Sequence, residues 1–207
     1  HLERFNPAVI ALRQKVTKPN RIEAQRFAPY KARGTEVDVV LDLMIHDIDI
    51  VLSLNDCALV NISASGQSVV TSDIDIAHAR LEFADGCVAE LAASRVSQDQ
   101  VRAMTIREAK SYISVDYMNH VLLVGEIDED GHADEHKEIS FETQKLSGTD
   151  VLMDEICSFV AAVSQGLQPQ VTGEDGKRAL EVAVEISRHI NEANGVAPSV
   201  TSELTQT

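Results

Sequence analysis

The sequence predicts an α+β domain in which helices pack on one face of a large, mainly antiparallel sheet. Three observations support this fold class. One long amphipathic helix is expected near the start, a series of short strands follows it, and two further amphipathic helices close the chain. With 207 residues the chain is long enough for one well-buried core. We expect residues 1–200 to form this domain and residues 201–207 to form a polar tail.

The first part of the chain predicts a short helix, a strand and a loop. Asn6 suits the N-cap position and Pro7 the first helical turn, so an amphipathic helix is expected within His1–Val16. Arg21–Ala28 alternates between apolar and polar residues, which is typical of a strand. Pro29–Glu36 is rich in turn-forming residues and predicts a loop.

The segment Val37–Ser53 predicts one amphipathic helix, around which the rest of the chain is organised. Its apolar residues recur at spacings of three and four and would bury one stripe: Val40, Leu41, Met44, Ile48, Val51 and Leu52. Four polar residues follow each other at steps of four, four and three, so they would line one edge of the helix: Asp38, Asp42, His46 and Asp49. An imidazole among carboxylates can act as an oriented acid or base. The same row is also compatible with an ordinary solvated helix surface.

The middle of the chain predicts seven short strands. Apolar and polar residues alternate most clearly from Ile74 to Phe83, and Ala84-Asp85-Gly86 predicts a tight hairpin turn. Short connections favour an antiparallel meander. The expected strands are Ala58–Val70, Asp73–Phe83, Cys87–Val96, Ala103–Glu108, Ser111–Asp116, Val121–Glu126 and Glu138–Phe141.

Two helices are expected at the end of the chain. Asp150–Gln165 carries an apolar face and ends at Gly166, and Glu174–Asn194 carries another and ends before Gly195. The apolar face of the first consists of Leu152, Ile156, Phe159, Val160 and Val163.

Composition excludes several classes of function. There are 18 Lys and Arg residues against 33 Asp and Glu residues, and a net charge of −15 disfavours binding to nucleic acid. No apolar run has the roughly 18 residues that a membrane span needs, and no secretory leader opens the sequence. The three cysteines are widely spaced, which favours reduced, buried thiols and a cytoplasmic location.

The sequence lacks the glycine fingerprint of a dinucleotide-binding domain, so this chain alone is not expected to bind NAD(P) well. We predict no metal site, because His132 and His136 belong to an acidic loop without the helical spacing of a zinc site. His78 and His120 are most simply structural. In Ser94–Ser97 the cation Arg95 is expected at the end of a strand. It would lie on an ordinary sheet surface or face a partner subunit or a substrate.

Four motifs occur in an order that resembles one protein family. They are Arg4-Phe5-Asn6-Pro7, Asp42-x-x-x-His46-x-x-Asp49, Arg95-Val96-Ser97 and Thr172-Gly173-Glu174-Asp175-Gly176. Together they resemble the C-terminal domain of the Gfo/Idh/MocA oxidoreductases over residues 1–195. The resemblance implies a fold similar to the C-terminal domain of glyceraldehyde-3-phosphate dehydrogenase. It also implies a substrate-binding and oligomerisation domain, with an N-terminal Rossmann domain that is not part of this sequence.

The resemblance implies an NAD(P)-dependent dehydrogenase that oxidises a sugar or nucleotide-sugar hydroxyl by hydride transfer. His46 would be the general base and Asp42 would orient it or share its proton. Arg4, Asn6 and Asp49 would contact substrate, Asn6 would also approach the cofactor, and Asp49 would otherwise hold the imidazole ring. NAD or NADP would be bound mainly by the absent domain, so this chain alone is expected to be inactive.

The opening and central motifs are similar to the nucleotide-sugar branch of the family. Lys31 and Arg33 would then bind the substrate diphosphate, or they merely solubilise a loop. Apolar residues on both faces of some strands predict a homodimer or homotetramer formed through the sheet face. Two alternatives remain: a stand-alone ligand-binding or assembly module without catalysis, and a metal-dependent hydrolase that uses His46 with the acidic row.

Overall fold

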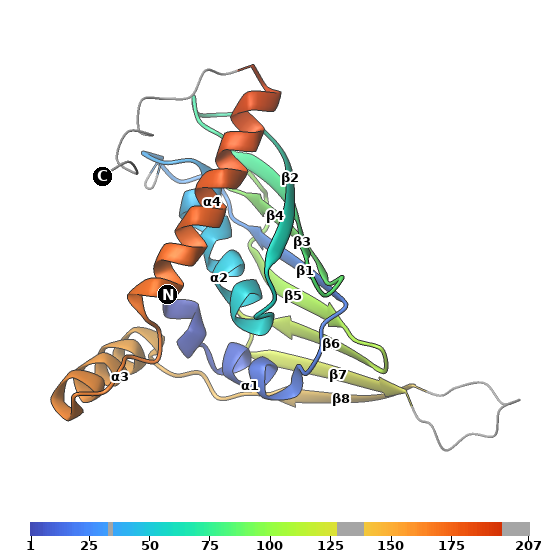
Figure 1. Cartoon of the computed structure of the whole chain (residues 1–207), viewed down its shortest axis with the longest axis vertical. Coiled ribbons are helices and arrows are strands. Elements are labelled where there is room, and N and C mark those ends of the chain that lie inside the picture. The colour runs from blue at the N-terminus through green and yellow to red at the C-terminus, as the bar shows by residue number, and fades with distance from the viewer. Residues whose placement is uncertain (33–34, 128–138, 196–207) are drawn as a thin grey trace, which may run out of the picture.

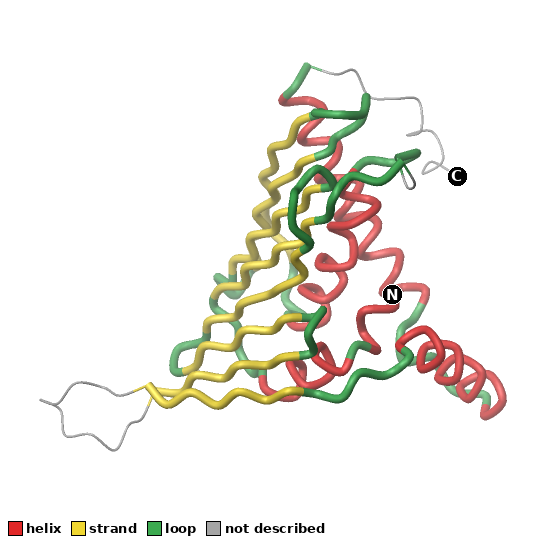
Figure 2. The backbone as a smooth tube through the Cα atoms, turned by 180° about the vertical axis from the view of Figure 1, so that it is seen from behind, coloured by secondary structure: helices red, strands yellow, loops and turns green. Residues whose placement is uncertain are grey.

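The computed structural model describes residues 1–32, 35–127 and 139–195. In these residues an eight-stranded sheet carries helices on one of its faces, and the opposite face is not covered by any described helix (Figures 1 and 2). The predicted α+β class is therefore confirmed. The expected tail at residues 201–207 and the His132–His136 segment lie outside the described residues.

The elements follow one another in a simple order. The helical ones are η1 (Leu2–Phe5), α1 (Pro7–Lys15), η2 (Val40–Met44), α2 (Ile45–Leu54), α3 (Val151–Gln165) and α4 (Gly173–Ala193). The strands are β1 (Arg21–Phe27), β2 (Leu59–Gln67), β3 (Ile76–Phe83), β4 (Val88–Ser94), β5 (Val101–Arg107), β6 (Ser111–Asp116), β7 (Val121–Ile127) and β8 (Ile139–Lys145). All strands and helices expected from the sequence are present, with shifts at their ends.

The sheet has the strand order β2-β3-β4-β1-β5-β6-β7-β8. Two antiparallel meanders, β2 to β4 and β5 to β8, flank β1. β1 is antiparallel to β5 but parallel to β4, so the sheet is mainly antiparallel, as predicted, and contains one parallel pair. Ile22 of β1 pairs with Ala89 on one side and Ile106 on the other, and all three are buried under the helices. The first strand thus forms the centre of the core.

Local sequence signals fix the ends of α1 and α4. The Asn6 side chain accepts a hydrogen bond from the Ala8 backbone nitrogen, and Pro7 begins the helix, as predicted. At α4, Thr172 and Asp175 form a reciprocal capping box. α4 packs along β2 and α2 (Figure 1). It approaches β2 closely at Gly66, where a Cβ atom would lie 3.0 Å from Cγ2 of Ile190 on α4.

The central helix differs from the prediction of one continuous α-helix. The segment Val40–Met44 is π-helical, and the regular α-helix begins only at Ile45. Asp38 precedes both and accepts hydrogen bonds from the backbone nitrogens of Val40 and Leu41. Asp38 therefore caps the segment instead of extending a row of side chains along it.

α3 extends away from the sheet (Figures 1 and 2) and carries an exposed apolar face. The predicted stripe is present, but its large side chains are about half exposed or more. They are Leu152 (56%), Met153 (54%), Ile156 (49%), Phe159 (56%), Val160 (58%) and Val163 (63%). Within the described part of the chain, α3 contacts η1, and Ile156 and Phe159 line a hollow with Phe5, but the stripe is not buried as the apolar faces of α2 and α4 are.

Some smaller expectations are corrected. Of the three thiols expected to be buried, Cys87 is buried, Cys57 is half-buried and Cys157 on α3 is exposed. Arg95 is also buried, and its Nη2 donates to the Val37 carbonyl at 2.7 Å, so it secures the approach to η2. None of the helices in the three described stretches is sufficiently long and apolar to cross a bilayer.

Candidate active site

His46 lies in the first turn of α2, on the side of the sheet that the helices cover. Its Nδ1 atom is buried and has no hydrogen-bond partner among the described residues. Burial lowers the pKa of the imidazole, and the positive charge of Arg26 lowers it further, although Glu3 and Asp47 act in the opposite direction. The uncharged imidazole is therefore favoured at neutral pH, and this is the form that can accept a proton.

A buried ion cluster lies beside His46. Arg26 donates to Asp47 from Nε at 2.8 Å and from Nη2 at 2.9 Å, and its Nη1 donates to Glu3 at 2.9 Å. Arg26 and Asp47 are each only 2% exposed. Arg102, which is partly exposed, lies 3.5 Å from the Glu3 carboxylate. The charges of two cations and two carboxylates in this cluster thus act on the imidazole.

Tyr117, in the turn between β6 and β7, packs against this ion cluster. Its ring lies under the Arg26 guanidinium at 5.9 Å, and its buried hydroxyl has no hydrogen-bond partner among the described residues. Burial raises the pKa of this hydroxyl well above its ordinary value, and the Asp47 charge raises it further, so it stays protonated. A buried hydroxyl without a partner is costly in a finished protein interior. The Tyr117 hydroxyl is thus available to a group that approaches the cluster.

Asn6 is held entirely within the domain. Its Oδ1 accepts from the Ala8 backbone nitrogen at 3.0 Å and lies 3.4 Å from Nδ1 of His120. Its Nδ2 donates to Glu3 and to the Tyr117 carbonyl, both at 3.3 Å. Every polar side-chain atom of Asn6 therefore already has a partner.

Arg4 and Asp49, which the sequence places at the site, bind each other. Asp49 is 1% exposed, and Arg4 also lies 3.4 Å from Asp175 at the start of α4. The Asp49 carboxylate therefore engages the guanidinium of Arg4 rather than the imidazole of His46. Neither side chain contacts His46, so the pair can influence it only by fixing the backbone of η1 against α2.

The remaining predicted site residues are Asp42, Lys31 and Arg33, and none of them belongs to this ion cluster among the described residues. Asp42 is half-buried in the π-helical segment, and among the described residues its side chain makes no hydrogen bond to that of His46. Lys31 is exposed in the loop that follows β1. Arg33 lies outside the described residues. Sequence spacing thus placed His46 among carboxylates, but the carboxylates whose charges act on it in the structure are Glu3 and Asp47 instead of Asp38 and Asp49.

Sequence reasoning missed Glu3, Arg26, Asp47 and Tyr117. A signal was present for Arg26, because it has the same parity in β1 as the buried residues Ile22 and Ala24. An arginine at an inward-facing strand position requires a buried acidic partner. Asp47 and Glu3 could not be assigned as these partners, because the pairing depends on how η1 and α2 pack on the strand.

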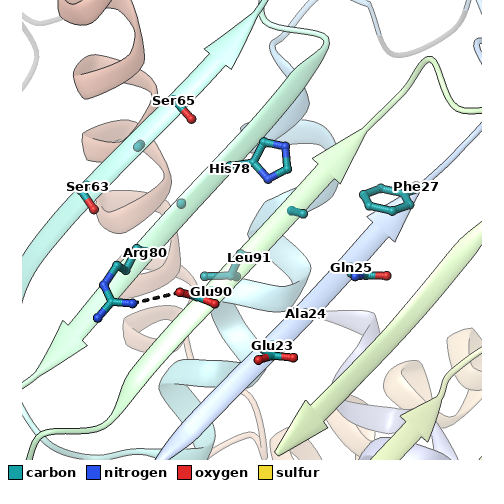
Figure 3. A pocket seen from close by; sticks show the side chains of 13 residues that line it. Glu23, Ala24, Gln25, Phe27, Ser63, Ser65, His78, Arg80, Glu90 and Leu91 are labelled. Carbon is teal, nitrogen blue, oxygen red and sulfur yellow. Dashed lines mark hydrogen bonds and ion pairs between the residues drawn. The ribbon is translucent and has the colours of Figure 1, made fainter.

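The opposite face of the sheet bears a shallow hollow of about 620 Å³ (Figure 3). Ser63, Ser65, His78, Arg80 and Glu90 line it, and Arg80 and Glu90 form an ion pair there at 2.9 Å. His78 is exposed on this face. The hollow is separated from His46 by the sheet itself. Elsewhere in the described residues, no group of three or more potential ligands could hold a metal ion.

Comparison with known proteins identifies the family. A family model described as the GFO/IDH/MocA C-terminal domain matches residues 11–113. The UDP-N-acetylglucosamine 3-dehydrogenase of Acidithiobacillus ferrooxidans is 35% identical over 187 residues, which are 90% of this chain and 59% of that protein. The chain belongs to the Gfo/Idh/MocA family. The resemblance noted in the sequence, including its nucleotide-sugar branch, is confirmed.

Solved structures of Gfo/Idh/MocA proteins share the fold. A structure of the same A. ferrooxidans enzyme, GnnA, has a TM-score of 0.85 at 34% identity, over 93% of this chain and 61% of that chain. Levoglucosan dehydrogenase in complex with NADH and L-sorbose has a TM-score of 0.77 at 14% identity, over 92% and 62%. The second likeness shows the fold alone. The chain thus spans about three fifths of the relatives that it matches.

Proposed function

We propose that this Gfo/Idh/MocA domain is the substrate-binding and catalytic part of an NAD(P)-dependent dehydrogenase. The substrate is a sugar or nucleotide sugar, of which one hydroxyl is oxidised. The observation that carries this proposal is the 34% identity and TM-score of 0.85 to UDP-N-acetylglucosamine 3-dehydrogenase, together with the buried imidazole of His46. The protein is expected to act in the cytoplasm.

His46 is the proposed general base. Oxidation of an alcohol requires that its hydroxyl proton leaves as hydride is transferred, and a neutral imidazole is suited to take that proton. Burial and the charge of Arg26 both keep His46 uncharged. Asp42 precedes it by one helical turn and is proposed to orient the substrate hydroxyl or to share the proton.

The nicotinamide cofactor, when bound, accepts the hydride. The sequence has no dinucleotide fingerprint, and the Asn6 side chain is already fully paired within the domain. We therefore propose that the part of the relatives that this chain does not span holds the cofactor, and that this chain alone does not turn over. Tyr117, with its unpartnered hydroxyl, is the described residue of the cluster best suited to meet a bound group.

Cations near the proposed site suit an anionic substrate. Arg102 is partly exposed beside Glu3, and Lys31 is exposed in the loop after β1. Arg33, which lies outside the described residues, follows Lys31 by two positions in the sequence. A nucleotide sugar carries a diphosphate, which lysine and arginine bind through charge-assisted hydrogen bonds. We propose that Arg4 and Asp49 support substrate binding indirectly, because their buried ion pair fixes η1 against α2.

The open sheet face is the proposed contact between copies of the protein. No helix of the described residues covers it, and it includes the hollow in Figure 3 as well as exposed Phe141 and Ile139 on β8. A dimer or tetramer through this face is testable by light scattering on Phe141→Asp. A wild-type monomer at micromolar concentrations would contradict it.

The function is tested with the full-length protein, its cofactor and UDP-N-acetylglucosamine. We expect reduction of the cofactor with the wild type and a loss of at least about 100-fold in kcat with His46→Ala. Cofactor affinity should remain unchanged, and Lys15→Ala, a surface change on α1, serves as the control. Turnover of His46→Ala at the wild-type rate would refute the assigned role.

A further inference from the structure

Four elements bring charged groups to His46. Glu3 comes from η1, Arg26 from β1, Asp47 from α2 and Arg102 from β5. Arg26 contacts two of the others directly, since it pairs with both Asp47 and Glu3. It is therefore the centre of the cluster, although it makes no described contact with the imidazole itself.

The geometry of Arg26 fixes the helix that carries His46. Two parallel hydrogen bonds join its guanidinium to the Asp47 carboxylate at 2.8 and 2.9 Å. Such a bidentate pair permits one relative orientation, whereas a lysine ammonium would permit many. Asp47 follows His46 directly in α2, so the same contact fixes the first turn of that helix. The hydrogen bond to Glu3 attaches η1 to the same guanidinium.

We propose that Arg26 is a positioning residue for His46, acting through Asp47 and Glu3. This inference rests on the proposed function of His46 as the general base. It extends that function because Arg26 lies in the core strand, outside all four motifs that resemble the family.

The electrostatics of the cluster support this role. Burial, Arg26 and Arg102 lower the pKa of His46, whereas Glu3 and Asp47 raise it. Loss of Arg26 would leave two carboxylates that favour the charged imidazolium. Loss of the Asp47 charge would instead leave an excess of positive charge. The two changes are therefore expected to move the pKa of His46 in opposite directions.

The test is an NMR titration of the histidine Cε1 protons in the 207-residue chain. The signal of His46 is assigned by its absence in His46→Gln. We expect Arg26→Gln to raise the titration midpoint of His46 and Asp47→Asn to lower it, each by about half a pH unit or more. Arg26→Lys keeps the charge but loses the bidentate geometry, so it is expected to raise the midpoint by less than Arg26→Gln does without reaching the wild-type value.

The Arg4–Asp49 pair provides a matched control. It has the same chemistry and bidentate geometry, and it also joins η1 to α2, yet it is not among the main charges that act on His46. Arg4→Gln and Asp49→Asn are therefore expected to leave the His46 midpoint unchanged. An equal shift in these variants would show a general loss of structure and would overturn the inference.

The Asp47→Asn variant tests the inference even if Arg26→Gln does not fold. Asp47→Asn preserves the side-chain shape and leaves Arg26 paired with Glu3, so it is expected to fold. A folded Asp47→Asn chain, verified by circular dichroism, with an unshifted His46 midpoint would overturn the inference. Because the titration requires no turnover, its result is independent of whether His46→Ala abolishes activity.

Discussion

Arg4 and Asp49 form a bidentate ion pair between segments that are 45 positions apart in the sequence. Nε of Arg4 donates to Oδ2 at 2.7 Å, and Nη2 donates to Oδ1 at 2.6 Å. Arg4 also reaches Asp175, so one guanidinium joins η1, α2 and α4. These three segments surround the end of the molecule that carries the proposed site.

Removal of Arg4 is expected to destabilise the fold strongly. Arg4→Met leaves the buried Asp49 carboxylate with only the His1 imidazole, 3.8 Å away, as an ion-pair partner, which should lower the free energy of unfolding by about 3–5 kcal/mol. The double variant Arg4→Met/Asp49→Leu removes both charges and should be clearly more stable than the single variant. Urea denaturation at pH 7 measures both. Equal losses in the two variants would show that the pair has another role.

The stability of the chain is expected to depend on His46 below neutral pH. The folded-state pKa of His46 is lowered, so the unfolded chain binds more protons as the pH falls through its ordinary value of about 6.5. The contribution is therefore complete above about pH 6.5 and is lost as the pH decreases toward the folded-state pKa. Urea denaturation at several pH values should show a weaker pH dependence in His46→Gln than in the wild type. Identical profiles would argue against a buried, neutral imidazole.

Asp75 is expected to stabilise the turn before β3. Its Oδ2 accepts from the backbone nitrogens of Val69, Val70 and Thr71, and these hydrogen bonds offset burial and lower its pKa to about 2. The stabilisation is present above the unfolded pKa of about 3.9 and is lost as the pH falls through about 2. Asp75→Asn should reduce the free energy of unfolding at pH 7 by about 2 kcal/mol.

A matched variant distinguishes this effect from a loss of surface charge. Asp73 lies two residues earlier and is exposed. Asp73→Asn is expected to change the free energy of unfolding by less than about 0.5 kcal/mol. If both variants lose the same stability, the hydrogen bonds to Asp75 are not its cause.

Gly66 is expected to tolerate no side chain. A Cβ atom there would lie 2.8 Å from the Ile76 carbonyl oxygen and 3.0 Å from Cγ2 of Ile190 on α4. Gly66→Ala should therefore cost about 1–3 kcal/mol, because backbone must move to accommodate the methyl group. Gly173→Ala, where nothing lies within 4 Å, is the control and should be near neutral. Thermal denaturation measures both, and a neutral Gly66→Ala would contradict the close packing of α4 on β2.

The apolar face of α3 is expected to make the isolated chain associate. Exposed Phe159 and Val163 belong to a stripe that runs along the helix, and an exposed stripe of this kind favours contact with another surface. Phe159→Ser/Val163→Ser should decrease the average mass in light scattering. Phe141→Ser on the open sheet face is the comparison, because it reports association through the sheet. No decrease in the α3 variant would indicate that α3 remains solvated.

Much of the fold could be predicted from local signals. Alternation located the strands, while Asn6 and Thr172 marked the starts of α1 and α4. The position of β1 could not be predicted, because its parallel pairing with β4 depends on contacts between segments more than 60 residues apart, such as Ile22 and Ala89. The π-helical segment was also missed, since the apolar spacing of Val40 and Met44 fits a regular α-helix equally well.

The candidate site was predicted at its centre but not in its surroundings. Periodicity alone placed His46 in the site row, and the same periodicity gave Asp42 and Asp49 as neighbours. The observed neighbours, Glu3 and Arg26, come from other elements. Helical spacing reports only on residues of one helix, so it cannot reveal the charges that packing brings from elsewhere.

Because the segment Val40–Met44 is π-helical, the orientation of the residues before His46 depends on the number of residues in that segment. Such a segment holds one more residue than the corresponding α-helical turn, and each residue of an α-helix rotates the chain by about 100°. A deletion of one residue here would give a regular helix and turn Asp38 by about 100° relative to His46. Insertions and deletions, more than substitutions, are therefore the changes by which related domains could retain the imidazole and acquire a different preference for substrate.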